Sequence, residues 1–167
     1  SAYMEAVSSF TQGLAGLATL PDTPQRAAQE LDLQLGLAWT VGVTKGFGAP
    51  EAEEAYTRAR TLCWQLEDTA QLAHALGGLA TFYRARGELH TARELEEQLL
   101  SLSQRLHDPE WLASAHHRLG MTLYHQGELI AARAHQEQAL ASYEQRLATY
   151  GIQRVVPQAG DVYFFCY

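Results

Sequence analysis

The chain repeats itself at a spacing of 40 residues. From 62 to 100, 15 of the 39 residues are identical to the residue found 40 positions further along, and Gly87-Glu88-Leu89, for example, recurs as Gly127-Glu128-Leu129. A fixed spacing of this size is typical of stacked supersecondary units, each of which buries its apolar face against its neighbour. Because stacked repeats present extended surfaces, the spacing favours a binding function over a catalytic one.

Within each repeat the residues indicate α-helices, because apolar residues recur three and four positions apart and good helix formers dominate. Residues that favour a helix start are Thr23-Pro24, Pro50, Asp68-Thr69 and Asp108-Pro109. Glycines that suit a left-handed helix end are Gly87, Gly127 and Gly151. The predicted helices are 3–19, 24–42, 50–67, 70–86, 89–107, 109–126 and 129–149.

These helices predict an all-α fold, a right-handed superhelix of stacked antiparallel helix pairs. We expect one helical repeat domain over residues 1–151, with a lone second-type helix at 3–19. Its repeats are expected at about 24–67, 70–107 and 109–149. Residues 43–49 are predicted to be a longer connection with Phe47 packed against the stack. The alternative of a phosphate loop is disfavoured, because Lys45-Gly46 lacks the Gly-x-x-x-x-Gly-Lys-Ser/Thr frame.

Residues 152–167 differ from the repeats and are interpreted as an apolar tail or a truncated next repeat. The segment 162–167 is aromatic and β-favouring, so we expect it to cover the open end of the stack or to mediate self-association.

The charge and apolar content limit the class of partner. The net charge of −7 argues against nucleic acid and anionic membrane surfaces as main partners, since both require a basic face. No apolar run approaches the roughly 20 residues needed to span a bilayer. The two cysteines, Cys63 and Cys166, are expected to be free thiols in a reducing compartment, with the cytoplasm as the default location.

The repeated residues resemble a known family. The string Leu79-Ala80-x-x-Tyr83-x-x-x-Gly87-Glu88-Leu89-x-x-Ala92, and its counterpart from Leu119 to Ala132, look like tetratricopeptide repeats with helices about a turn longer than usual. Each repeat is expected to have a first helix (A) and a second helix (B) that cross closely. The small residues of the two strings lie at this crossing: Ala80, Ala92, Gly120 and Ala132.

A finer resemblance covers about 5–150. It rests on Leu20-Pro21-Asp22-Thr23-Pro24, Gln29-Glu30-Leu31, Thr44-Lys45-Gly46-Phe47, Ala49-Pro50-Glu51 and the segment Ala55 to Cys63. Together they are similar to the long-repeat tetratricopeptide region of large bacterial signalling proteins. In that family the region follows an ATPase module, often with an adenylate or guanylate cyclase or a DNA-binding domain on the same chain.

The resemblance implies that partners bind the concave surface formed by the A helices. Projected by register, the candidate partner-binding residues are His74, Thr81, Arg84, His117, Met121, Tyr124 and His125, with Gly77 and Ser114 beside them. Their mix of aromatic, Met, His and Arg side chains suits a peptide or helix ligand. By contrast, the pairs Arg93 with Glu97 and Arg133 with Glu137 are expected to face outward.

No catalytic or cofactor site is predicted. The chain lacks a nucleophile elbow, a His-Glu-x-x-His motif and a dinucleotide glycine motif. His117 and His125 are too far apart along a helix to share a metal ion, so no metal is expected. The acidic residues 51, 53, 54, 94, 96 and 97 are expected to stay solvated near helix starts. Trp39, Trp64 and Trp111 are expected to be packing residues.

We therefore predict a non-enzymatic protein-protein interaction or regulatory scaffold, cut from a multidomain bacterial signalling ATPase or cyclase. The alternative is a sensor domain that binds a small effector in the concave groove. A partner module predicts a shallow, peptide-sized groove, whereas a sensor predicts a closed cavity with converging polar groups.

Overall fold

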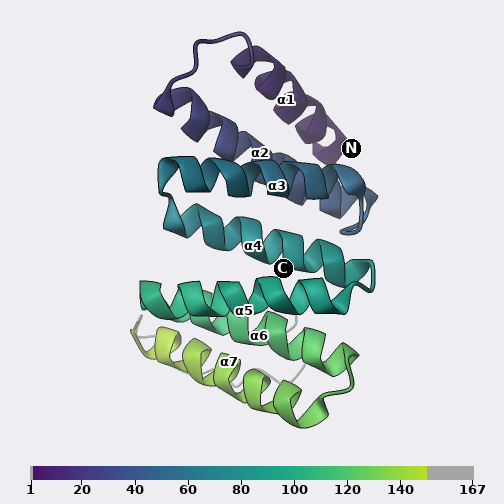
Figure 1. Ribbon diagram of the computed structural model, residues 1–167, viewed down its shortest axis with the longest axis vertical. Coiled ribbons are helices and arrows are strands. Elements are labelled where there is room, and N and C mark those ends of the chain that lie inside the picture. The colour runs from purple at the N-terminus through teal and green to yellow at the C-terminus, as the bar shows by residue number, and fades with distance from the viewer. Residues whose placement is uncertain (1, 150–167) are drawn as a thin grey trace. The chain divides into compact units, whose positions relative to one another are not determined.

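The computed structural model describes residues 2–149, and it is entirely helical over that range apart from short turns. The helices are α1 (Ala2–Leu17), α2 (Pro24–Lys45), α3 (Pro50–Leu66), α4 (Thr69–Ala85), α5 (Leu89–Leu106), α6 (Pro109–His125) and α7 (Leu129–Thr149) (Figure 1). The all-α, tetratricopeptide-like fold class predicted from the sequence is confirmed. The predictions for Gly151 and for the tail lie outside the described residues.

The helix boundaries follow local capping chemistry. The Thr23 side chain accepts a hydrogen bond from the Arg26 amide, and the Asp68 and Asp108 side chains cap α4 and α6 in the same way. Gly87 and Gly127 have φ values of +78° and +82°, in the left-handed region expected for a residue that ends a helix. The predicted signals at both kinds of helix end are confirmed at these positions.

The connection predicted over residues 43–49 is shorter than expected. α2 continues to Lys45, and it ends at Gly46, whose amide donates to the Gly42 carbonyl and whose φ is +99°. Phe47 packs on Gly42, where an added Cβ would lie 2.7 Å from Phe47 Cδ1. The expected packing of Phe47 is therefore confirmed, but the wide loop is wrong.

The helices form two compact units, one up to Leu102 and one from Ser103 onward. In the first unit, α1 packs on α2, α2 on α3 and α3 on α4, as consecutive neighbours. Tyr56 on α3 packs closely against Gly78 on α4: an added Cβ there would lie 2.2 Å from Tyr56 Cε1. In the second unit, α6 and α7 form a helical hairpin. Within residues 2–149 none of the helices is long and apolar enough to cross a lipid bilayer.

Candidate functional site

The candidate residues on α4 divide into exposed and buried groups. His74 is exposed, and Thr81 is half-buried with its hydroxyl donating to the Gly77 carbonyl at 2.9 Å. Arg84 is only 13% exposed, and its Nη1 donates to Glu96 Oε1 at 2.6 Å. Of these three side chains, His74 is therefore the one most accessible to a partner.

Glu96 was expected to be solvated, and that expectation is wrong. Its side chain is fully buried between α5 and α4 and is paired with Arg84. A buried carboxylate retains its charge only when a cation or several hydrogen-bond donors compensate for the lost water. The pair therefore gives Arg84 a structural role inside the first unit.

The candidate residues on α6 also separate by burial. His117 is buried, where its Nδ1 donates to Gln136 Oε1 at 3.0 Å and Gln136 Nε2 donates back to the His117 carbonyl at 3.2 Å. Met121 is half-buried. Tyr124 is 63% exposed, and its ring meets the exposed His125 ring edge-on at 5.7 Å between centroids. Tyr124, His125 and Met121 thus form the accessible part of this face.

A second polar pair, partly buried, lies beside the first in the α6–α7 hairpin. His116 Nδ1 lies 2.9 Å from His135 Nδ1, a distance that requires one ring to donate and the other to accept. Burial, and then the neighbouring His135, lower the pKa of His116 below its ordinary value. In the stretch that the structure describes, no three His, Cys, Asp or Glu side chains gather to hold a metal ion.

Neither the cysteine nor the outer charges form a reactive site. Cys63 is buried, and burial raises the pKa of its thiol to about 11, so the nucleophilic thiolate is scarce at neutral pH.

The outward pairs predicted from the sequence are confirmed: Arg93 Nε donates to Glu97 Oε1 at 2.9 Å, and Arg133 Nε to Glu137 Oε1 at 2.8 Å.

The prediction that Trp64 packs in the core is wrong. The side chain is 69% exposed on α3, next to the buried Cys63. Trp39 is also 42% exposed, although its ring leans on Phe47 at 5.6 Å between centroids. Tryptophan side chains are usually largely buried, either in a protein core or in an interface with a partner. Trp64 is therefore a candidate binding residue that sequence reasoning missed.

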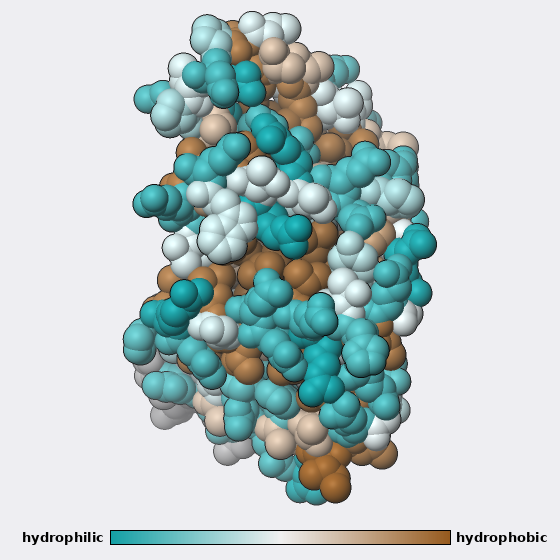
Figure 2. All heavy atoms as spheres, viewed as in Figure 1, coloured by the Kyte–Doolittle hydropathy of each residue, from teal (hydrophilic) through white to brown (hydrophobic). Residues whose placement is uncertain are grey.

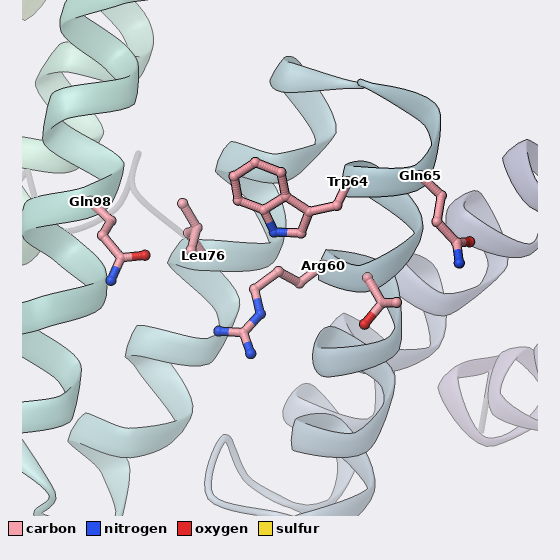
Figure 3. Close-up of a pocket in the computed structure, with 6 residues that line it drawn as sticks. Arg60, Trp64, Gln65, Leu76 and Gln98 are labelled. Atoms are coloured by element: carbon pink, nitrogen blue, oxygen red, sulfur yellow. The ribbon is translucent and has the colours of Figure 1, made fainter.

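Trp64 lines an open hollow of about 470 Å³ in the first unit. Figure 3 shows Arg60 and Trp64 reaching from α3 toward Leu76 on α4, with Gln98 of α5 on the far side. In Figure 2, hydrophobic surface is recessed over α4, between the more polar bands of α3 and α5. A second hollow of about 530 Å³, also open to solvent, lies on α7 and is lined by Leu129, Ile130, Arg133, Ala134 and Glu137.

A signal for the Trp64 hollow was present in the repeat. The buried Leu62 and the half-buried Leu66 recur as Leu102 and Leu106, whereas Trp64 corresponds to Gln104. Gln104 is polar and exposed, which indicates that this position of the repeat faces solvent. In addition, buried residues of α3 recur at three- and four-residue spacing, and Trp64 lies outside that series.

Comparison with known proteins agrees with the fold. Residues 68–145 match the tetratricopeptide repeat family, so the chain contains a tetratricopeptide-repeat region. No curated protein sequence matches the chain significantly. The structure of the TPR domain of Arabidopsis FLU is similar, with a TM-score of 0.65, 20% identity, and coverage of 71% of this chain and 98% of that one. BtubC (BKLC) from P. vanneervenii is also similar, with a TM-score of 0.63, 18% identity, and coverage of 95% and 79%.

Proposed function

We propose that this chain is a non-enzymatic module that binds a protein or peptide partner through exposed residues of its A helices. The observation that carries the proposal is Tyr124, which holds a large aromatic ring 63% exposed against His125 on α6. Tyrosine is enriched among the residues that dominate binding energy, because it buries a large rigid surface at little cost in conformational entropy. Met121, beside it, supplies an adaptable apolar surface.

The accessible set is smaller than the seven residues expected from the sequence. His74, Thr81, Met121, Tyr124 and His125 remain the proposed contacts, each on the face of its own unit. Arg84 and His117 are engaged with Glu96 and Gln136, so we assign them to holding their helix pairs together. Both hollows described above are open to solvent, so neither is the closed cavity that an effector sensor predicts.

A photo-crosslinking amino acid at position 124 tests this proposal in the cells that produce the protein. Position 133 on α7 is the matched control, because Arg133 is exposed and paired outward with Glu137. We expect a discrete crosslinked partner from position 124 and none from position 133. Tyr124→Ala should abolish the crosslink made from a second reporter at position 125, and Tyr124→Phe should retain it. Equal crosslinking from positions 124 and 133 would contradict the proposal.

We further propose that the module belongs to a larger bacterial signalling protein that carries an ATPase module, and that it works in the cytoplasm. The support is the family resemblance over about 5–150 and the buried, unpaired Cys63 thiol, which suits a reducing compartment. Sequencing the coding region upstream tests the first point. A nucleotide-binding ATPase module there supports it, and an unrelated or absent upstream domain contradicts it.

A further inference from the structure

We propose that the hollow between α3 and α5 is a second docking site, which takes a short segment of a partner protein carrying an apolar side chain next to an acidic one. The site is independent of the Tyr124 surface. It is formed by the B helices α3 and α5 over Leu76 of α4, whereas the Tyr124 surface lies on α6. Its elements are an exposed indole, an apolar floor, one guanidinium and a neutral polar rim.

The apolar part of the site consists of Trp64 and Leu76. Trp64 stands 69% exposed at the side of the hollow, and Leu76 forms part of its floor with 4% of its surface exposed. An apolar side chain inserted between them removes part of the indole from water and gains the burial energy of both surfaces. Because the indole does not recur in the next repeat, it is not a requirement of the repeat architecture.

The charge in the site belongs to Arg60. The other arginines of residues 2–102 each have a carboxylate partner: Arg26, Arg58, Arg84, Arg86 and Arg93. Among the described residues, Arg60 has neither an ion pair nor a hydrogen bond, and it is the only charged residue that lines the hollow. This cation stands out on a chain whose net charge is −7.

An acidic side chain is the natural complement to this arrangement. A guanidinium presents donors in a planar fork that a carboxylate accepts in two parallel hydrogen bonds. The acid that pairs with Arg60 must lie within a few residues of the apolar side chain, because Arg60 and Trp64 are one helical turn apart on the same face of α3. A single cation on an acidic chain does not suit nucleic acid, which needs several phosphate contacts.

The rim completes a surface suited to a peptide. Thr61, Gln65 and Gln98 line the hollow with neutral groups that both donate and accept hydrogen bonds. Such groups can satisfy the backbone amides and carbonyls of a bound segment without adding charge. The polar rim around an aromatic and arginine centre matches the usual anatomy of a binding surface.

The test uses the whole chain and a displayed library of random peptides about 12 residues long. Peptides are selected on the wild-type protein and counter-selected on Trp64→Ala, whose exposed side chain can be removed without loss of folding. We expect the surviving peptides to share an acidic residue close to Leu, Ile, Met or an aromatic residue. No peptide that prefers wild type over Trp64→Ala, or survivors without an acid, would overturn the proposal.

A charge exchange tests the role of Arg60. The best synthetic peptide should bind Arg60→Glu at least tenfold more weakly, and replacing its acid with Lys should restore binding to Arg60→Glu. Arg86→Glu, which makes the same change at an exposed arginine directly after α4, is the control and should bind like wild type. In a ¹⁵N spectrum, the peptide should shift the indole signal of Trp64 and leave those of Trp39 and Trp111 in place. Failure of the exchange, or equal shifts of all three indoles, would also overturn the proposal.

Discussion

Arg84 Nη1 lies 2.6 Å from Glu96 Oε1, and the Glu96 side chain of that pair is fully buried. The equivalent positions in the next repeat are Tyr124 and Gln136, so the cation and the anion are lost together. There, Gln136 is satisfied by His117, which replaces Gly77. The equivalent positions of the two repeats thus carry different polar partners, a buried ion pair in one and a half-buried amide bonded to a histidine in the other.

This relationship predicts the stability of Arg84 variants. Arg84→Ala leaves the Glu96 carboxylate buried without its cation and should lower the free energy of unfolding by about 3 kcal/mol or more. The double variant Arg84→Met with Glu96→Gln removes both charges and should be considerably more stable than Arg84→Ala alone. Urea denaturation followed by circular dichroism measures both. If the single variant were as stable as wild type, the pair would have no structural role.

The helix crossings predict the effect of enlarging a small residue. Ala132 is buried where α7 approaches α6, and a Cβ added at Gly120 would lie 3.1 Å from the Ala132 carbonyl oxygen. Ala132→Leu should therefore cost about 1–3 kcal/mol by overpacking. Ala92, fully buried at the equivalent position on α5, should behave in the same way. Ala134→Leu, at an exposed position of α7, is the control and should have little effect on the urea midpoint.

The pair His116 and His135 predicts a pH dependence with a defined sign. The pKa of His116 is lowered in the folded protein, first by burial and then by His135, whereas in the unfolded chain it lies near the ordinary value of 6.5. Above that value both states are neutral. As the pH falls below it, the unfolded state takes up the proton first, so stability decreases.

Urea midpoints at about pH 7.5 and about pH 5.5 check this sign. His116→Leu introduces the residue found at the equivalent position 76 and should reduce the loss of stability at the lower pH. His90→Gln, at an exposed position on α5, should leave the loss unchanged. A wild-type protein that became more stable in acid would contradict the lowered pKa.

The buried thiol predicts slow alkylation. The pKa of Cys63 is raised from 9.0 to about 11, which lowers the thiolate fraction at neutral pH by about a hundredfold before any steric protection. In a Cys166→Ser background, iodoacetamide should label the native protein at least a hundredfold more slowly than the urea-unfolded protein. Comparable rates in the two states would show that Cys63 is accessible.

Features that depend on neighbouring residues in the chain were predictable from the sequence. The caps at Thr23, Asp68 and Asp108 need only an amide two or three residues away, and Gly87 and Gly127 answer a backbone requirement at the end of a single helix. The helix positions followed from the same local information. The fold class was predictable as well, because helix positions that repeat at a fixed spacing indicate a stack of equivalent helix pairs.

Features that depend on distant partners were not predictable in the same way. Glu96 is charged and sits near acidic neighbours, and only the approach of Arg84 on another helix makes its burial possible. For the same reason the availability of Arg84 for a partner was overestimated. For Trp64 the residue type suggested packing, whereas the polar Gln104 at the equivalent position of the next repeat indicated exposure.

The unlike polar pairs of the two repeats also bear on how the chain avoids misfolding. Repeats with 15 of 39 positions identical offer similar apolar faces, so a helix can be mistaken for its counterpart during folding. If α4 paired with α7, Arg84 would face the neutral Gln136; if α6 paired with α5, Glu96 would be buried against Tyr124 with no cation. In each exchanged hairpin, one charged side chain would be buried between two helices without an opposite charge. We therefore expect the unlike polar pairs to disfavour exchanged hairpins during folding.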